Sequence, residues 1–241
     1  MPTNLPDASA SPKTVLITGG TSGIGLAVAR AFVARTEAVV HVIGRRALDL
    51  AATFGAAAGR VKLHKLDLAE EIPVSWRVLP EGQALDILIH CAGTLIHSPF
   101  GKTRRADWEH TFAVNVFGVA ELTQRLLPHL QAAERPHIVT IGSMGGYQGA
   151  SKFPGLSAYS ASKGALTTLS ECLAVELAEQ NIAVNCLCLG AVNTDMLRQA
   201  FPGYDAPVQP EEVARYIVNF ALSAHEVMNG RVVPVAGGDP G

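Results

Sequence analysis

Tyr159 and Lys163 stand four residues apart at the start of a segment with helical periodicity. Residues at this spacing share one face of a helix, so both side chains can point into the same cleft. A free tyrosine phenol loses its proton only near pH ~10. A cation about 4 Å away, at an effective dielectric constant near 20, stabilises a phenolate by about 4 kcal/mol, which is enough for proton exchange at neutral pH. The pair predicts acid–base chemistry; the alternative is an ordinary helix with an exposed lysine and a half-buried tyrosine.

Ser143 and Asn115 are the other polar residues whose positions suggest a chemical role. Ser143 follows the apolar run 137–141, so its hydroxyl is expected at the carboxyl end of a strand, where it can bond a substrate oxygen while Tyr159 moves the proton. Asn115 lies in an apolar helical stretch, where a buried amide needs partners, and a water held against Lys163 would be one. Alternatively, Asn115 satisfies a neighbouring carbonyl or bends the helix.

A glycine-rich loop follows the first apolar run of the chain. Gly19 can form the tight turn, Gly23 lets the backbone approach a pyrophosphate, and Gly25 lets the next helix pack closely on the strand. The helix N-terminus then offers free N–H groups and the positive end of its dipole to the anion. A glycine-rich turn without a ligand is the alternative. The residues expected to bind a dinucleotide here are Gly19, Thr21, Ser22, Gly23, Ile24 and Gly25.

The second apolar run, 38–43, ends at Gly44 and is followed by Arg45 and Arg46. An Asp or Glu at this place would bind the ribose 2′-OH of NAD and repel a 2′-phosphate. Guanidinium groups pair bidentately with phosphate, so the two arginines favour NADP(H) over NAD(H). The alternative is that both arginines are solvated loop charges. A further basic residue in the glycine loop would strengthen the preference for NADP(H), but Ser22 stands at that position.

Short apolar runs alternate with longer segments of helical periodicity along almost the whole chain. This alternation predicts an α/β fold of βαβ units, with a doubly wound parallel sheet and helices on both faces. Ligands are expected at the carboxyl ends of the strands. The segment 69–83 is weakly patterned, and no full helix is predicted there. The strands are expected at 15–17, 38–43, 61–66, 85–91, 137–141, 182–189 and 232–235, and the helices at 24–35, 103–127, 157–180, 194–201 and 210–223.

The composition excludes several classes of protein. The chain has 241 residues, 48% of them hydrophobic and 17% charged, with a formal net charge of -2. It lacks the basic excess of a nucleic-acid-binding protein and is too apolar for a disordered one. Its 4 cysteines are too few for a disulfide scaffold, and neither a membrane span, a secretory signal nor a metal-ligand spacing is visible. We expect a cytoplasmic protein with a mobile tail over residues 1–12 and one domain over 13–241.

Several motifs occur together in one order over nearly the whole chain. They are Thr18–Gly25, Asp67-Leu68, Cys91-Ala92-Gly93, Asn115, Ser143, Tyr159-x-x-x-Lys163 and Leu189-Gly190 to Thr194. In this combination the chain resembles the short-chain dehydrogenase/reductase family. The resemblance implies a single-domain Rossmann-type sheet of seven strands, an NAD(P)(H) cofactor, and reversible hydride transfer between a carbonyl and an alcohol.

The same resemblance implies roles for individual residues. Tyr159 would be the acid/base, Lys163 would hold the nicotinamide ribose and stabilise the phenolate, Ser143 would orient the substrate oxygen, and Asn115 would seat a water in the proton relay. The remaining cofactor residues would be Asp67 and Leu68 near the adenine, Ala92 and Gly93 near its ribose, and Gly190, Val192 and Thr194 near the nicotinamide carboxamide.

The chain departs from the family pattern at several places. His90 and Cys91 replace two asparagines, and we interpret His90 as a structural substitute. The segment from Ser143 to Tyr159 is a few residues longer than usual, which indicates a reshaped substrate wall. The lid after Thr194 is short, with candidate wall residues Met196, Leu197, Phe201 and Tyr204. His97 is interpreted as a surface-loop residue, with a place at the border of the cleft as the alternative.

The helices at 103–127 and 157–180 carry more apolar residues than one sheet face can cover, which predicts a homodimer or homotetramer. The leading hypothesis is an NADP(H)-dependent oxidoreductase acting on a small-molecule ketone, aldehyde or secondary alcohol. The alternative is a non-catalytic NAD(P)-binding regulatory or scaffold protein of the same fold. The complete set of Asn115, Ser143, Tyr159 and Lys163 argues against that alternative, because a sensor needs only the nucleotide half.

Overall fold

The computed structural model describes residues 12–237, so the tail predicted over residues 1–12 lies outside the described residues apart from Pro12. Seven strands form one parallel sheet in the order β3-β2-β1-β4-β5-β6-β7. The chain runs outward from β1 to β3, returns to β4 beside β1, and continues outward to β7, which confirms the predicted doubly wound fold. The strands are β1 (Thr14–Thr18), β2 (Val39–Gly44), β3 (Val61–Lys65), β4 (Ile87–His90), β5 (His137–Ser143), β6 (Ala183–Leu189) and β7 (Val232–Val235).

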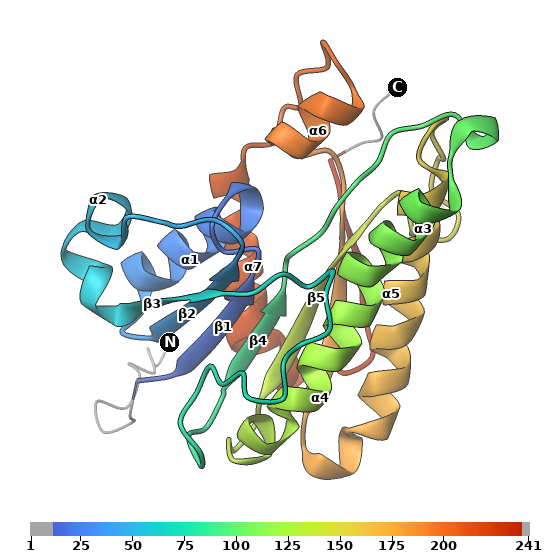
Figure 1. Cartoon of the computed structure of the whole chain (residues 1–241). Coiled ribbons are helices and arrows are strands. Elements are labelled where there is room, and N and C mark those ends of the chain that lie inside the picture. The colour runs from blue at the N-terminus through green and yellow to red at the C-terminus, as the bar shows by residue number, and fades with distance from the viewer. Residues whose placement is uncertain (1–11, 238–241) are drawn as a thin grey trace, which may run out of the picture.

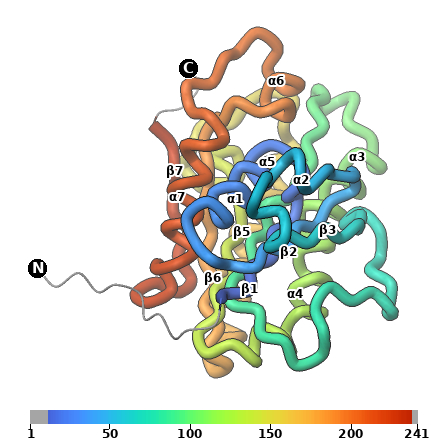
Figure 2. Tube along the Cα trace, turned by 90° about the vertical axis from the view of Figure 1, so that its left-hand side faces the viewer, coloured from blue at the N-terminus to red at the C-terminus, as the bar shows by residue number. Residues whose placement is uncertain are grey.

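Helices cover both faces of this sheet (Figure 1). Successive residues of a strand point to opposite faces, so Val15 packs with α1 and α7 while Leu16 packs with α4 and α5. Figure 2 shows α7 together with β7 at one side of the molecule. The longer helices are α1 (Gly23–Arg35), α3 (Arg105–Phe112), α4 (Gly118–Gln131), α5 (Ser157–Glu176) and α7 (Pro210–Ser223), and the short ones are α2 (Leu50–Phe54), α6 (Asp195–Ala200), η1 (Gly55–Arg60), η2 (Phe100–Lys102), η4 (Ala178–Gln180) and η5 (Ala224–Glu226).

The helix predicted over 103–127 is interrupted by a π-type turn, η3 (Ala113–Phe117), between α3 and α4. Gly118 N donates to the carbonyl oxygen of Ala113, five residues earlier, instead of the usual four. Four short elements of the described residues, α2, η1, η2 and η5, were not predicted. The segment 69–83 contains no helix, in agreement with its weak pattern.

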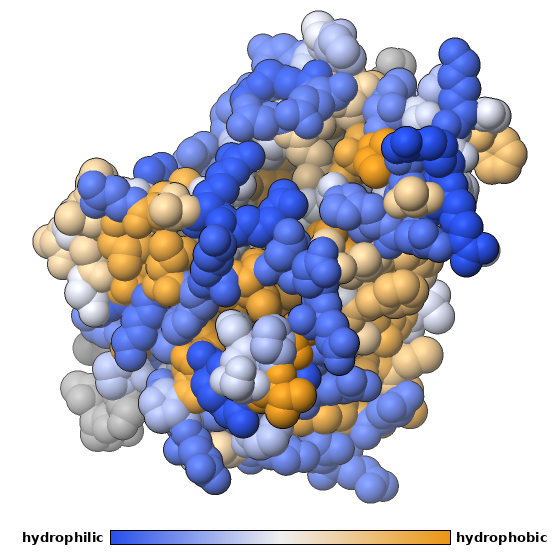
Figure 3. All heavy atoms as spheres, in the orientation of Figure 1, coloured by the Kyte–Doolittle hydropathy of each residue, from blue (hydrophilic) through white to orange (hydrophobic). Residues whose placement is uncertain are grey.

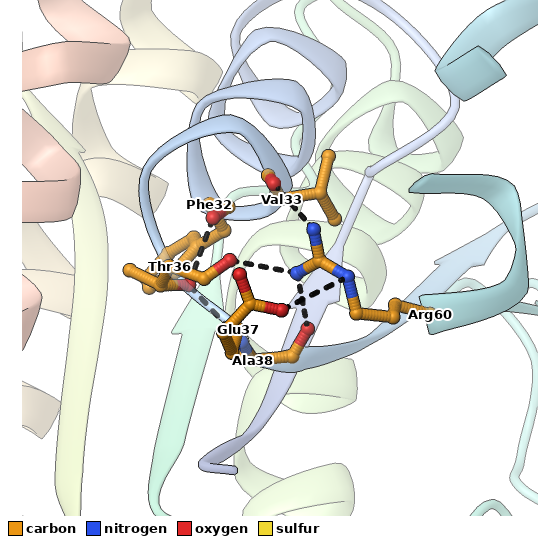
Figure 4. Close-up of polar contacts among 6 residues, drawn as sticks. All are labelled: Phe32, Val33, Thr36, Glu37, Ala38 and Arg60. Carbon is orange, nitrogen blue, oxygen red and sulfur yellow. Dashed lines mark hydrogen bonds and ion pairs between the residues drawn. The ribbon is translucent and has the colours of Figure 1, made fainter. Parts of the chain in front are cut away.

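Arg60 ties the end of η1 to the turn between α1 and β2 (Figure 4). Its Nη1 donates to the carbonyl oxygens of Thr36 (2.7 Å) and Ala38 (3.3 Å), and its Nη2 donates to that of Val33 (2.7 Å). Its Nε lies 3.8 Å from the carboxylate of Glu37. Carbonyl oxygens at a helix C-terminus have no partner inside the helix, so the guanidinium satisfies groups that would otherwise need water. It thereby holds the start of β2 and the loop that follows this strand.

Replacing Arg60 by methionine is expected to lower the free energy of unfolding by about 2 kcal/mol, because backbone carbonyls lose a charged donor while the aliphatic stem is retained. Urea denaturation followed by circular dichroism measures the change. The matched control is Arg30→Met on the exposed side of α1, which we expect to stay within about 0.5 kcal/mol of the unmodified chain. If Arg60→Met lowers the free energy of unfolding no more than Arg30→Met does, the stabilising role of Arg60 is contradicted.

Candidate active site

Ser143 and Tyr159 meet at the carboxyl end of β5. Ser143 is the last residue of this strand, and Tyr159 lies in the first turn of α5. A Cβ atom built on Gly145 would lie 3.4 Å from the Ser143 hydroxyl oxygen and 3.8 Å from the Tyr159 ring. The Ser143 oxygen accepts a hydrogen bond from Gly145 N (3.1 Å), so it is held in place. Both hydroxyl-bearing side chains therefore border the same small space beside Gly145.

Lys163 lies one turn further along α5 than Tyr159. It is only 4% exposed, and its Nζ donates to the carbonyl oxygen of Ile141 (2.7 Å), two residues before Ser143. A Cβ atom built on Gly93 would lie 3.5 Å from this Nζ. The loop after β5 packs directly on the helix here, because a Cβ atom on Gly146 would lie 2.5 Å from the Lys163 carbonyl carbon. The ammonium group is thus fixed between the ends of β4 and β5.

Asn115 lies in the π-type turn η3 and is fully buried. Its Oδ1 accepts from Thr94 N (2.8 Å), and its Nδ2 donates to the Thr94 carbonyl oxygen (3.0 Å) and to Ser162 Oγ (2.9 Å). The side chain therefore satisfies a neighbouring carbonyl and links the loop after β4 to α5. Only one lone pair of Oδ1 is left for a water. π-type turns recur at functional sites, and this one places Asn115 Oδ1 3.5 Å from the same point beside Gly93 that Lys163 approaches.

His90 and Thr18 support the loop after β4. The imidazole of His90 is buried, and its Nε2 lies 2.9 Å from the Thr123 hydroxyl of α4. Burial lowers the pKa of His90 to about 3, so the ring is neutral at physiological pH. The Thr18 hydroxyl oxygen accepts from the backbone N–H groups of Cys91 (3.1 Å) and Ala92 (3.0 Å). Sequence reasoning missed this use of Thr18, whose only signal was a hydroxyl residue at the end of the first strand.

A cavity opens at the carboxyl ends of β1 to β4, beside the groups just described. Two further residues that line it, Thr94 and Val114, were not predicted, because neither belongs to a glycine or charge motif. Ile43, Gly44 and Leu66 complete the lining. The predicted cofactor residues that line this cavity are Gly19, Thr21, Ser22, Arg45, Arg46, Asp67, Leu68, Ala92 and Gly93.

The shape of this cavity depends on three glycines. Gly19 has a φ of +69°, and a Cβ atom there would lie 2.8 Å from Cα of Ala92. A Cβ atom on Gly44 would lie 2.5 Å from the Thr21 hydroxyl oxygen, and one on Gly25 would lie 2.4 Å from the Gly19 carbonyl oxygen. The absence of a side chain at these glycines lets the ends of β1, β2 and β4 approach each other. The loop in front of α1 therefore presents its backbone to the cavity. This arrangement fits the phosphates of a dinucleotide.

Arg45 and Arg46 lie at the rim of the cavity beyond β2. Arg45 Nη1 is 3.7 Å from Asp67 Oδ2, with the two side chains 64% and 39% exposed. Asp67 Oδ1 also accepts a hydrogen bond from Ala69 N (3.0 Å), which holds the carboxylate beside the cavity. The guanidinium groups occupy the place where an acidic residue would bind a ribose 2′-OH.

Thr194 and Gly23 bring the lid and the glycine loop together. A Cβ atom on Gly23 would lie 3.8 Å from Thr194 Cγ2, and both residues line a second cavity. The Thr194 hydroxyl oxygen accepts from Leu197 N (3.2 Å) and so caps α6. Ile24 packs against the core below the glycine loop. The lid therefore begins directly beside the loop that starts α1.

The remaining predicted nicotinamide-side residues serve the packing of β6. A Cβ atom on Gly190 would lie 2.8 Å from the Ala236 side chain, and Gly190 N donates to the Val235 carbonyl oxygen (2.9 Å). Val192 is buried in the core and forms an isolated bridge with Val208. Its side chain is thus part of the core and not of the cavity surface.

Residues 12–237 contain no group of three His, Cys, Asp or Glu side chains that could hold a metal ion. Within the same range, every helix is too short or too polar to cross a membrane. All four cysteines, Cys91, Cys172, Cys186 and Cys188, are free thiols.

The family model described as short chain dehydrogenase matches residues 13–205 of the chain. The chain therefore belongs to this family, whose members are oxidoreductases that act on alcohols or carbonyl groups and bind NAD(P)(H). The observed sheet of seven strands confirms the fold that the sequence motifs predicted.

Individual relatives agree with this assignment. The chain is 33% identical over 244 residues to glycine betaine reductase ATRR of Emericella nidulans, covering 93% of this chain but only 19% of that protein's length. It is 35% identical over 202 residues to 2,3-dihydro-2,3-dihydroxybenzoate dehydrogenase of Escherichia coli, covering 83% of this chain and 77% of the relative. A solved structure of 3-oxoacyl (acyl-carrier-protein) reductase from Agrobacterium tumefaciens with NADP bound is 25% identical, with a TM-score of 0.78 and coverage of 94% and 93% of the two chains.

Proposed function

We propose that this chain transfers a hydride between NADP(H) and a carbonyl or secondary alcohol substrate, with Tyr159 as the general acid/base. The observation that carries the proposal is the convergence of Tyr159, Ser143 and Lys163 at the end of β5, next to the cavity behind the glycine loop. A nicotinamide dinucleotide, when bound, supplies the hydride donor or acceptor. Its phosphates would meet the backbone of the glycine loop, and its adenosine half would lie along Asp67, Leu68 and Ala92.

The side chains of the chain handle the proton and the substrate oxygen. Tyr159 donates its hydroxyl proton to a carbonyl oxygen during reduction and takes it back from the alcohol during oxidation. Lys163 stabilises the phenolate because its ammonium group is buried and held in place by the Ile141 carbonyl. Ser143 donates a hydrogen bond to the substrate oxygen. Asn115 acts as a positioning residue, since its bonds keep the loop after β4 close to Lys163.

A Tyr159→Phe variant removes one hydroxyl and should lower kcat by about 10²- to 10⁴-fold, the usual contribution of a positioned acid/base. The dissociation constant for NADPH should change by less than about twofold, because the ring and its packing remain. Both are measured by NADPH absorbance and fluorescence against a panel of ketones and aldehydes. The control is Tyr216→Phe on α7, whose ring is 42% exposed and contacts Phe220.

Unchanged turnover in Tyr159→Phe would contradict the proposed mechanism. If the unmodified chain binds NADPH tightly but acts on no member of the panel, the result favours the alternative of a non-catalytic regulatory or scaffold protein.

The preference for NADP(H) is supported by the two guanidinium groups at the rim beyond β2. A 2′-phosphate there would receive charged hydrogen bonds from Arg45 and Arg46, and the four residues directly after β2, 45–48, include no acidic side chain to repel it. The Asp67 carboxylate, 3.7 Å from Arg45, keeps this arginine at the cavity while leaving it largely exposed. An exposed ion pair of this kind contributes less than about 1 kcal/mol to stability, so Arg45 can exchange the carboxylate for a phosphate at little cost.

Replacing both Arg45 and Arg46 by leucine should raise the dissociation constant for NADPH by at least about tenfold, since a hydrogen bond to a charged group contributes about 1.5–3 kcal/mol. The constant for NADH should change much less. Fluorescence titration with both nucleotides gives the ratio of the two dissociation constants. Arg77→Leu, in the segment between β3 and β4, is the control. Equal affinity of the unmodified chain for the two nucleotides would contradict the preference.

A homodimer or homotetramer is supported by apolar side chains on the outer side of η3, α4 and α5. Phe117 is 62% exposed and Val175 is 77% exposed, whereas Leu166 and Leu177 of the same segment as Val175 are buried in the core. Figure 3 shows an apolar area over α4 and α5. Apolar surface that no other part of the chain covers belongs to a subunit interface more often than it faces solvent.

A Val175→Arg variant is expected to shift the chain from an oligomer to a monomer, because a charge would be buried in the interface. Multi-angle light scattering at micromolar concentration measures the mass. Val227→Arg, at a site 87% exposed after η5, is the control and should leave the mass unchanged. An unmodified chain that is monomeric under these conditions refutes the expectation.

Three further expectations complete the proposal. We propose residues 13–241 as one domain, since α1, α2, α4, α5 and α7 all pack on the one sheet. A cytoplasmic location is supported by the four free thiols, which a reducing compartment would preserve. Neither nucleic acid nor a membrane is expected as a partner, given the net charge of -2.

A further inference from the structure

Three loops that follow β4, β5 and β6 meet through aromatic rings. His97 comes from the loop after β4, Phe153 from the loop after β5, and Phe201 from the lid after α6. The rings of Phe153 and Phe201 are 5.5 Å apart and nearly perpendicular, at 82°. The rings of His97 and Phe201 are 6.5 Å apart and tilted by 59°. Phe201 is the centre of this aromatic cluster, since it contacts both other rings.

The aromatic cluster lies close to the catalytic groups. Its His97 ring packs on Gly155, where a Cβ atom would lie 2.6 Å from Nε2, and Ser98 N donates to the Gly155 carbonyl oxygen (3.0 Å). Gly155 precedes Tyr159 by four residues, which span at most about 14 Å even when fully extended. Figures 1 and 2 place α6 and α3 at the same end of the molecule, beyond the carboxyl ends of the strands. Gly155, on which the His97 ring packs, therefore lies within about 14 Å of Tyr159, at the end of the molecule where the substrate oxygen is proposed to bind.

The rings are only partly covered by the chain itself. Phe153 and Phe201 are half-buried and His97 is exposed, whereas the large apolar side chains of the core are buried almost completely. A phenylalanine that keeps part of its ring accessible offers apolar area for a ligand. Packing among the three rings holds that area in a defined shape, because edge-to-face contacts prefer one geometry.

The cations nearest in sequence to Phe153 and Phe201 already have hydrogen-bond or ion-pair partners. Lys152 Nζ donates to the carbonyl oxygens of Tyr147 (2.7 Å) and Ala150 (3.0 Å), which closes the loop after β5 on itself. Arg198 of α6 pairs with the Asp195 carboxylate (2.6 Å) and with the Asn193 side chain. Each cation thus already has partners within its own segment and is less available to a carboxylate or phosphate on the substrate, so the surroundings of the cluster favour an uncharged group.

We infer that the aromatic cluster of His97, Phe153 and Phe201 is a specificity wall for an uncharged, ring-bearing carbonyl or alcohol substrate. The reacting oxygen lies at Tyr159 and Ser143, and the ring attached to the carbinol carbon packs against Phe201 and Phe153. This inference rests on the proposed oxidoreductase function and adds the substrate class. Contact between the lid and the two other loops also couples ring binding to the position of α6.

Binding and turnover of two ketones that differ in their apolar group test the inference. Acetone and acetophenone share the reacting carbonyl, and only acetophenone carries a ring. Ligand-observed NMR measures their binding to the chain saturated with the oxidised dinucleotide, a complex in which no hydride can be transferred to the ketone. Turnover with the reduced dinucleotide gives kcat and KM for each ketone separately. The binding measurement stands even if the proposed catalysis fails, so the two failures are distinguishable.

Phe201→Ala is expected to weaken acetophenone binding about tenfold and to raise its KM by a similar factor, with acetone changed by less than about twofold. Phe153→Ala should act in the same direction, and Phe201→Tyr, which keeps the ring, should restore binding. Phe100→Ala is the matched control, because Phe100 is 72% exposed in η2 and lies outside the cluster. The affinity for the dinucleotide should stay constant in all variants, which separates a specificity role from loss of the fold.

Absence of acetophenone binding in the unmodified chain would overturn the inference. An equal loss of binding for both ketones in Phe201→Ala would also overturn it, as would unchanged acetophenone binding in both Phe201→Ala and Phe153→Ala. 4-Acetylbenzoate adds a carboxylate to the same ring and should bind more weakly than acetophenone; tighter binding would overturn the restriction to uncharged substrates.

Discussion

The parallel alignment of the seven strands is the constraint on which every part of the site depends. In a parallel sheet all carboxyl ends lie at one edge, so residues that are far apart in the sequence leave the sheet side by side. The glycine loop follows β1, the arginine pair follows β2, and Ser143 ends β5. The aromatic cluster has the same origin, because its three loops follow β4, β5 and β6. A single antiparallel strand among these would send its loop to the opposite edge.

Lys163 is the second constraint, because a buried ammonium group is costly unless its protons are bonded. It is 4% exposed, it donates to the Ile141 carbonyl, and no ion pair with a carboxylate is found for it among residues 12–237. An anion formed beside it is therefore favoured, and the phenol of Tyr159 is one turn of α5 away. In the proposed mechanism, the buried charge that weakens the fold locally is the one that stabilises the phenolate of Tyr159.

Much of this architecture could be predicted from the residues alone. Strands such as 137–141 and 182–189 are apolar at most positions because helices cover both sides of the sheet, and this pattern can be recognised without knowing any tertiary contact. The segment 69–83 lacks such a pattern and has no helix. The π-type turn could not be predicted, because Asn115 is held there by Thr94 and Ser162, which are distant in the sequence. The buried position of the Val192 side chain likewise depends on Val208 from the far side of the lid.

The sequence by itself determined the order of strands and helices, the glycine loop, and the spacing of Tyr159 and Lys163 on one helix face. These are local properties, set by side-chain periodicity and by the backbone freedom of glycine. Only the tertiary structure decided that Ser143 and Tyr159 border the same space beside Gly145, that Arg45 is held by Asp67, and that rings from three loops meet at Phe201. Such contacts join residues far apart in the chain, and their geometry follows from how the loops pack after the sheet has aligned them.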